Sequence, residues 1–144
     1  MSLTQRTIGV PPQRVWAVLA DGWSYPLWVV GASRMRDVDA AWPKEGSALH
    51  HSVGAWPLLI DDRTTVEECL PEHLLRLSAR SWPLGRAAVT VCLDPAGEDT
   101  MVTMREDAVA GPGRMVPRPL RALLLHRRNR EALARLAFLA EGRG

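Results

Sequence analysis

Asn129 interrupts an apolar stripe on a helix that residue spacing predicts over residues 119–141. The apolar members of that stripe recur every three or four residues: Ala122, Leu125, Ala132, Leu133, Leu136 and Ala140. A buried amide that lacks a hydrogen-bond partner costs roughly 1–3 kcal/mol. Asn129 could therefore bind a polar group of a ligand, bond a strand backbone or a water, or lie at the helix edge. His126, about one turn earlier, flanks the stripe and could reach a pocket mouth or interact with surface charges.

Two adjacent histidines, His50 and His51, fall on a strand predicted over residues 47–53. Adjacent strand residues point to opposite faces, so the pair does not form a simple two-histidine chelate. One of the two should face inward, where it could take part in proton transfer because imidazole titrates near neutral pH. We include His50 among the candidate site residues, and either histidine remains open for that role.

Glu106 is the third candidate for acid–base chemistry. It continues the face of Val102 and Met104 on a strand predicted over residues 100–109, which directs it inward. A carboxylate there could orient a substrate hydroxyl or act as a base, and a salt bridge with an arginine is the alternative. Val89 lies on the inward face of the preceding strand. Small or flexible side chains such as Met104 suit an adaptable cavity lining and a close-packed core equally well.

These candidates depend on a series of strands separated by turns. Alternation and turn signals predict strands over residues 3–10, 34–38, 47–53, 58–69, 74–82, 86–93 and 100–109. Pro11-Pro12 ends the first strand and opens a helix that stops at Asp21-Gly22. A second short helix begins near Pro26. The short, regular connections predict an antiparallel meander followed by one long helix.

Composition places the chain among globular proteins. Its 144 residues fit a single domain over 1–144, and 47% hydrophobic with 24% charged residues argue against disorder. No segment approaches the roughly 18 apolar residues that span a bilayer. The first residues lack the basic-then-apolar pattern of a signal peptide, so we expect a cytoplasmic protein.

Several classes of chemistry lack their motifs in this sequence. Cys69 and Cys92 are isolated, so we expect two reduced thiols in preference to a disulfide or a zinc site. The chain contains no Gly-rich phosphate loop, nucleophile elbow or H-E-x-x-H pattern. We therefore expect neither a metal nor another cofactor, and no covalent or phosphoryl-transfer chemistry.

Charge is unevenly distributed along the chain. The formal net charge is +2, but residues 1–111 carry −4 and residues 112–144 carry +6. This basic segment could be a solvated helix face, or it could contact an anionic lipid surface or an acidic partner weakly. Leu120, Leu124 and Phe138 fall on its charged side and could pack on a loop, a partner or a membrane. No nucleic-acid-binding motif accompanies the arginines, so we expect no nucleic-acid partner.

Residues spread over the whole chain also match a known family pattern. They are Ile8, Pro11-Pro12, Val15-Trp16, Leu19, Tyr25-Pro26, Trp28, Val29, Pro43, Gly46, Val66-Glu67-Glu68, Pro71, residues 133–136 and Ala140-Glu141. With them the chain resembles the START-like SRPBCC superfamily, in its polyketide cyclase/dehydrase and lipid-transport branch. The resemblance implies an α+β helix-grip fold: a curved antiparallel sheet of about seven strands grips a long C-terminal helix, and two short helices follow the first strand. It also implies a mostly apolar pocket beneath the long helix, with Trp28 near its mouth.

Two functions follow as hypotheses. In the first, the pocket binds a hydrophobic or aromatic small molecule, lipid- or polyketide-like, and the protein acts as carrier, sequestering protein or sensor. The candidate ligand-binding residues are Trp28, His50, Val89, Met104, Glu106, His126 and Asn129. The alternative is an enzyme of cyclase, aromatase or dehydratase type that uses one of the paired histidines, Glu106 or His126 for acid–base catalysis. Two titratable groups converging inside the pocket would favour the enzyme.

Overall fold

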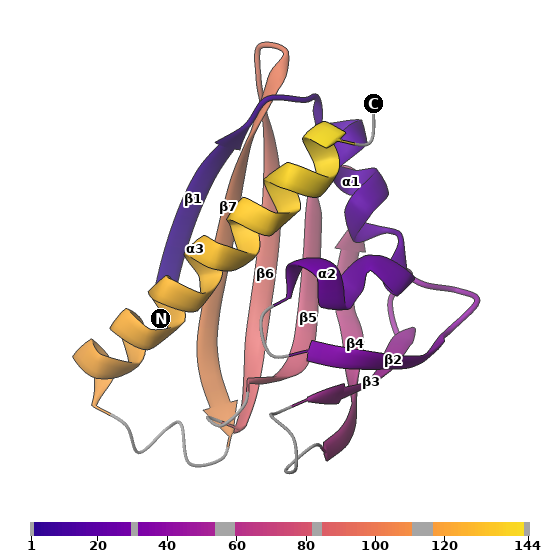
Figure 1. The fold of residues 1–144 in the computed structure, drawn as a ribbon, viewed down its shortest axis with the longest axis vertical. Helices are drawn as coiled ribbons and strands as arrows, with labels where there is room; N and C mark the ends of the chain where they lie inside the picture. Colours follow the sequence, from indigo (N-terminus) through magenta and orange to yellow (C-terminus); the bar gives the residue numbers. More distant parts are fainter. Residues whose placement is uncertain (1, 30–31, 54–59, 82–84, 111–116, 143–144) are drawn as a thin grey trace.

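Seven antiparallel strands form one curved sheet in the computed structural model, which describes residues 2–29, 32–53, 60–81, 85–110 and 117–142. In chain order the elements are β1 (Ser2–Ile8), α1 (Pro12–Leu19), the 3-10 turn η1 (Gly22–Ser24), α2 (Tyr25–Trp28), β2 (Ala32–Val38), β3 (Ala48–Val53), β4 (Ile60–Leu70), β5 (Leu74–Ser81), β6 (Gly85–Ala96), β7 (Asp99–Ala110) and α3 (Arg118–Gly142). The predicted helix-grip architecture is confirmed, including the two short helices after the first strand (Figure 1).

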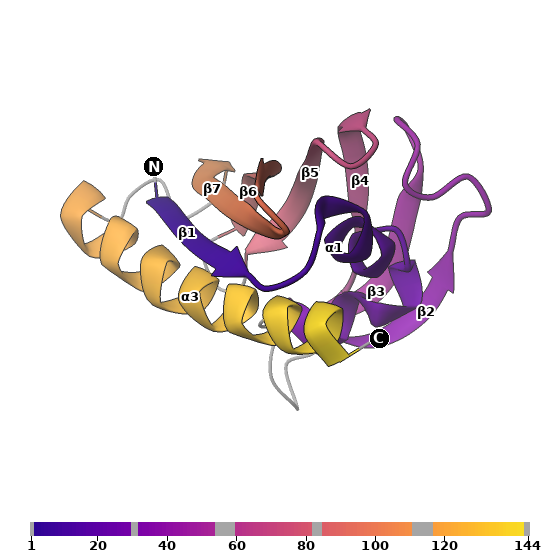
Figure 2. The same cartoon turned by 90° about the horizontal axis from the view of Figure 1, so that it is seen from above.

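The sheet order is β1-β7-β6-β5-β4-β3-β2. Strands β2 to β7 pair with their neighbours in sequence, as hairpin connections require. The exception is β1, which pairs with β7 in a register that sets Ser2 opposite Glu106 and Ile8 opposite Thr100. Helices α1 and α3 both lie on the concave side of the sheet (Figure 2).

Local sequence explains how the chain reaches α2 from β1. Pro12 is the first residue of α1, where its missing N–H has no helical partner to lose. Gly22 follows α1 in a site without room for a side chain. A Cβ there would lie 2.6 Å from a methyl carbon of Leu49 and 2.8 Å from one of Val38. This close approach draws η1 and α2 against β2 and β3.

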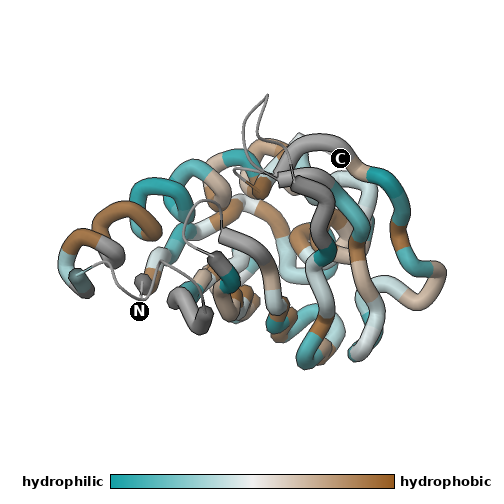
Figure 3. Tube along the Cα trace, turned by 90° about the horizontal axis from the view of Figure 1, so that it is seen from below, coloured by the Kyte–Doolittle hydropathy of each residue, from teal (hydrophilic) through white to brown (hydrophobic). Residues whose placement is uncertain are grey.

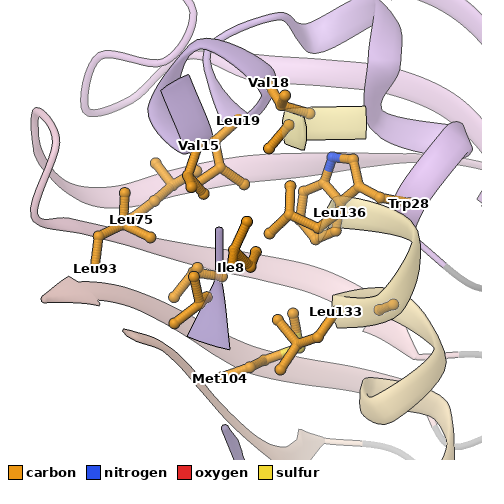
Figure 4. Close-up of a cluster of buried hydrophobic side chains, with 14 of the residues drawn as sticks. Ile8, Val15, Val18, Leu19, Trp28, Leu75, Leu93, Met104, Leu133 and Leu136 are labelled. Atoms are coloured by element: carbon orange, nitrogen blue, oxygen red, sulfur yellow. The ribbon is translucent and has the colours of Figure 1, made fainter. Parts of the chain in front are cut away.

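The core occupies the space between the sheet and the helices. Alternate residues of the strands point inward, among them Leu75 and Leu77 of β5 and Val91 and Leu93 of β6. Figure 4 shows Ile8, Leu133 and Met104 in the same cluster, between strands and helix. The stripe predicted on the long helix is buried at Leu125, Asn129, Ala132, Leu133, Leu136 and Ala140; the side chain of Ala122 lies outside the described residues.

Hydrogen bonds along α3 fix it to the first part of the chain. Arg14 of α1 donates to the carbonyl of Ala140 at 3.2 Å. The backbone N–H of Gly9 donates to a carboxylate oxygen of Glu141 at 3.0 Å. These contacts hold the C-terminal end of α3 beside α1, and the helix runs across the sheet from there (Figure 1).

Two further sequence expectations concern cysteine and the membrane. Both cysteines, Cys69 and Cys92, are free thiols and half-buried. Within the described segments, no helix is both long enough and apolar enough to cross a bilayer.

Candidate functional site

A cavity of about 50 Å³ lies between the sheet and helices α2 and α3. Its lining comes from four parts of the fold: Tyr25, Trp28 and Val29 at α2, Leu77, Ala79 and Val89 on β5 and β6, Met104 and Glu106 on β7, and Arg128, Asn129 and Ala132 on α3. Three lining residues, Leu77, Val89 and Glu106, are direct cross-strand neighbours. The cavity therefore has a mostly apolar wall with one carboxylate set into the sheet.

Five of the seven residues predicted for the site line this cavity. They are Trp28, Val89, Met104, Glu106 and Asn129. Glu106 is almost fully buried, as its place on the inward face of β7 predicts. Trp28 is also buried, and its ring meets that of Tyr25 edge-on with centroids 5.6 Å apart. Trp28 thus lies in the wall of the cavity.

The two predicted histidines do not line the cavity. His50 is half-buried, and its Nε2 atom lies 3.1 Å from a carboxylate oxygen of Asp39. This hydrogen bond is the main cause of a lowered pKa at Asp39. His126 is exposed on α3, where its Nδ1 atom and the Thr4 hydroxyl oxygen are 3.1 Å apart. His50 and His126 therefore have structural partners elsewhere, and neither belongs to the cavity.

His51, the neighbour of His50, is the histidine that faces the interior. It is fully buried, and its Nε2 atom lies 2.7 Å from the Thr64 hydroxyl oxygen. The Tyr25 hydroxyl shares a hydrogen bond of 3.2 Å with the same Thr64 oxygen. Thr64 thus connects the histidine to a tyrosine whose ring lines the cavity. The three side chains form a polar row that begins at the cavity wall.

Burial strongly affects the ionisation of Tyr25. The pKa of its hydroxyl is raised from 10.0 to about 12, mainly by desolvation; the hydrogen bond with Thr64 opposes this rise, and the negative charge of Glu106 adds to it. Tyr25 is therefore a neutral hydroxyl at physiological pH, able to donate or accept a hydrogen bond. The influence of Glu106 also means that two titratable groups converge on this cavity.

Asn129 brings a different kind of polar group to the same cavity. Its side chain is 2% exposed, and its Nδ2 atom has no hydrogen-bond partner among the residues that the structure describes. Buried side-chain amides are usually satisfied, because leaving one unpaired costs about 1–3 kcal/mol. The amide therefore presents an N–H donor at the cavity without a protein acceptor in the described part of the chain.

The sequence prediction did not include Tyr25 or Arg128 among the site residues, and it left open which of His50 and His51 faces inward. Tyr25 precedes Trp28 by three residues, a spacing that places both on one face of a helical turn. His51 follows Leu49 by two residues, and the fully buried side chain of Leu49 marks the inward face of the strand. Arg128 directly precedes Asn129, and no sequence pattern distinguishes it from the other arginines of the helix.

The described residues contain no group of three or more His, Cys, Asp or Glu side chains that could hold a metal ion. The cavity lining itself offers the hydroxyl of Tyr25, the carboxylate of Glu106, the guanidinium of Arg128 and the amide of Asn129. These groups can bind a polar substituent and move a proton, while the apolar wall accommodates a hydrocarbon or aromatic body.

Solved structures share this fold at low sequence identity. Protein NE0264 from Nitrosomonas europaea superposes with a TM-score of 0.74 at 18% identity, covering 98% of this chain and 94% of that one. The Zhui aromatase/cyclase from Streptomyces sp. R1128 gives 0.72 at 17% identity, with 98% and 93% covered. The di-domain ARO/CYC StfQ from the steffimycin biosynthetic pathway gives 0.73 at 14% identity; the match covers 98% of this chain and 50% of StfQ. At these identities the likeness shows the shared fold.

Sequence comparison identifies the family. No curated protein matches the chain. A family model described as "Polyketide cyclase / dehydrase and lipid transport" matches residues 3–141, from the second residue of β1 to the last residue but one of α3. The chain therefore belongs to the polyketide cyclase/dehydrase and lipid transport family.

Proposed function

We propose that this protein binds an apolar or aromatic small molecule carrying an oxygen acceptor, in the cavity between the sheet and α3, as a carrier, sequestering protein or sensor. The observation that carries the proposal is Asn129. Its buried Nδ2 donor lines the cavity without an acceptor in the described part of the chain. A carbonyl, hydroxyl or carboxylate oxygen of a ligand would supply that acceptor. The apolar wall from Leu77, Val89 and Met104 would contact the rest of the ligand.

Ligand binding at this site requires the lining to open. A cavity of about 50 Å³ holds a few water molecules, whereas pockets for drug-sized ligands measure roughly 300–1,000 Å³. Met104 is unbranched and can change rotamer at low cost. Trp28 lies on α2, a helix of four residues, where few backbone hydrogen bonds resist displacement. Movement of the Met104 and Trp28 side chains would enlarge the cavity while the hydrogen bond between Tyr25 and Thr64 keeps α2 on the sheet.

A matched ligand pair tests the proposal. We suggest titrating 2-acetylnaphthalene and 2-ethylnaphthalene into the isotope-labelled protein and following backbone NMR shifts. Both probes have the same bicyclic body, and only the first carries a carbonyl oxygen. The wild type should bind the ketone about tenfold more tightly, which corresponds to one hydrogen bond.

The variant Asn129→Leu should lose that preference while still binding the hydrocarbon. Leu70→Ser, an exposed change at the end of β4, should retain it and serves as the control. The proposal would be overturned if neither probe shifted the backbone NMR signals of the cavity residues. A preference for the ketone that survives in Asn129→Leu would also overturn it.

A second candidate function is acid–base catalysis on a polyketide-like substrate. It is favoured by a specific observation: Tyr25 and Glu106 both line the cavity, and the charge of Glu106 raises the pKa of Tyr25. In such an enzyme Glu106 would accept a proton from carbon next to a substrate carbonyl. The neutral Tyr25 hydroxyl and the Asn129 amide would donate hydrogen bonds to the developing oxyanion.

Turnover separates this function from simple binding. A β-polyketone thioester can be incubated with the protein, and cyclised aromatic products measured by chromatography against the spontaneous reaction. If the protein is an enzyme, Glu106→Gln and Tyr25→Phe should each reduce turnover by about 100-fold. Leu70→Ser should leave turnover unchanged. A wild-type product distribution identical to the spontaneous one would exclude this reaction and leave the binding function intact.

A further inference from the structure

The outward face of α3 combines exposed apolar side chains with positive charge. Six residues of α3 follow one another at spacings of three and four, so they share one side of the helix. They are Leu120, Leu124, Arg127, Glu131, Arg135 and Phe138. All six are exposed, and Phe138 is 78% exposed. We call these six residues the outer stripe of α3. It lies opposite the buried stripe that contains Asn129 and Leu133.

A neighbouring element extends this apolar surface. Leu27 of α2 is 55% exposed, and together with Phe138 and Leu139 it lines a shallow surface groove between α2 and α3. The groove is also lined by Arg135, whose Nε atom donates to Glu131 at 3.0 Å. Apolar and charged side chains therefore lie close together in this groove.

The charge of α3 indicates what kind of partner this surface would bind. Within Arg118–Gly142 there are six arginines and two glutamates. Figure 3 shows hydrophobic turns near the start of α3 followed by strongly hydrophilic ones. Arg127, Arg130 and Arg135 are exposed on the described part of α3, and Arg135 is paired with Glu131. An exposed basic helix face with separate apolar side chains matches an anionic planar surface.

We propose that the outer stripe of α3, together with Leu27, binds the surface of a membrane containing anionic lipids, with the helix lying parallel to the bilayer. Phe138, Leu27, Leu120 and Leu124 insert among the lipid headgroups. Arg127 and Arg130, both exposed, lie at the level of the phosphates, because the long arginine stem lets the guanidinium reach the polar layer. This binding is interfacial, and it does not depend on whether the cavity takes a ligand.

The orientation places the cavity beside the membrane. Trp28 and Val29 at α2 and Arg128 and Ala132 on α3 line it from the two elements that carry the docking residues. A membrane-bound molecule would thus meet the protein along the α2–α3 side. The convex face of the sheet, where Arg105 and Leu70 are exposed, would face away from the bilayer.

Vesicle co-sedimentation tests the proposal with the full chain. One set of vesicles is phosphatidylcholine alone, and the other contains roughly 30% phosphatidylserine, close to an anionic cytoplasmic leaflet. The wild type should bind the anionic vesicles at least about tenfold more tightly, and about 0.5 M salt should abolish the difference. Arg127→Glu/Arg130→Glu should remove most of the preference. Leu27→Ser/Phe138→Ser should weaken binding to both kinds of vesicle.

Matched controls change the same chemistry on the convex face. Arg105→Glu repeats the charge reversal, and Leu70→Ser repeats the loss of an exposed apolar side chain. Each should change vesicle affinity by less than about twofold. Circular dichroism melts establish that every variant is folded, and all substituted positions are exposed. Equal binding to both vesicle types would overturn the proposal. Absence of binding to either type would overturn it and indicate a protein partner. An equal loss of binding in Arg105→Glu would overturn it and indicate unspecific attraction.

Discussion

The imidazole ring of His51 packs against the phenol ring of Tyr25, with centroids 5.3 Å apart and ring planes inclined by 30°. The contact joins β3 to α2, and both polar ends meet the hydroxyl of Thr64 on β4. Three elements that are separate in the sequence are thereby connected through one oxygen atom. Their relative positions determine where Tyr25 stands in the cavity wall.

Thr64→Val should therefore destabilise the protein although it conserves side-chain shape. Removing the hydroxyl eliminates the hydrogen bonds to both Tyr25 and His51 in a fully buried position, so we expect a loss of about 1–3 kcal/mol in the free energy of unfolding. Urea denaturation measures it. Thr64→Ser keeps the hydroxyl and loses one methyl group, which costs about 1 kcal/mol or less. A valine variant as stable as the wild type would show that the shared oxygen contributes nothing.

Tyr25 is the only tyrosine in the chain, so its titration can be observed directly. Absorbance at the phenolate band should report a pKa of about 12 in the native protein and about 10 after unfolding. Because the native pKa is raised, the unfolded chain loses this proton first. Stability should be unaffected by this group below pH 10 and should fall by about 3 kcal/mol as the pH rises towards 12. Tyr25→Phe should lack this part of the pH dependence.

Gly22→Ala tests the close approach of η1 to the sheet. The added Cβ would meet Leu49 and Val38 at distances shorter than van der Waals contact. Both neighbours are partly or fully buried, so we expect a loss of about 1–3 kcal/mol, measured by thermal or urea unfolding. Gly142→Ala is the matched control, since a Cβ there meets nothing within 4 Å, and its effect should stay within about 0.5 kcal/mol. Equal effects at the two glycines would contradict the steric explanation.

Asn129→Leu should separate stability from binding. Replacing a buried amide whose Nδ2 atom lacks a partner in the described chain removes a desolvation cost, so the variant should be at least as stable as the wild type and up to about 1 kcal/mol more stable. The same change should abolish the preference for a ketone ligand. Melting temperature and ligand titration on one sample measure both effects. A marked destabilisation would indicate that the amide supports the fold.

The sequence predicted the fold well because local signals agreed with one another. The strand predicted over residues 74–82 is β5, Leu74–Ser81, and the helix predicted over 119–141 is α3, Arg118–Gly142. Proline and glycine residues mark these boundaries, and their effects on the backbone depend little on tertiary contacts. The inward direction of Glu106 followed in the same way from alternation along its strand.

The candidate site was less predictable, because it depends on which strand face is inward and on how side chains fill space. Choosing between His50 and His51 required knowing which face of β3 is buried. Leu49 and His51 are buried on the same face, and this could be recognised only by assigning Leu49 to the core first. Tyr25 looked like a family marker next to Pro26, whereas its hydroxyl reaches Thr64 on a distant strand. The volume of the cavity depends on rotamers such as that of Met104, which residue types alone do not determine.

The pairing of β1 with β7 has a consequence for the order in which the molecule assembles. Strand β1 is synthesised first, yet its partner begins only at Asp99, and the helix that covers both starts at Arg118. Closing this edge joins opposite ends of the chain, which makes folding slow relative to that of proteins rich in local contacts. During translation β2 to β6 can form hairpins one after another while β1 remains unpaired. The cavity is completed only when α3 packs over the sheet, because Arg128, Asn129 and Ala132 of that helix belong to its lining.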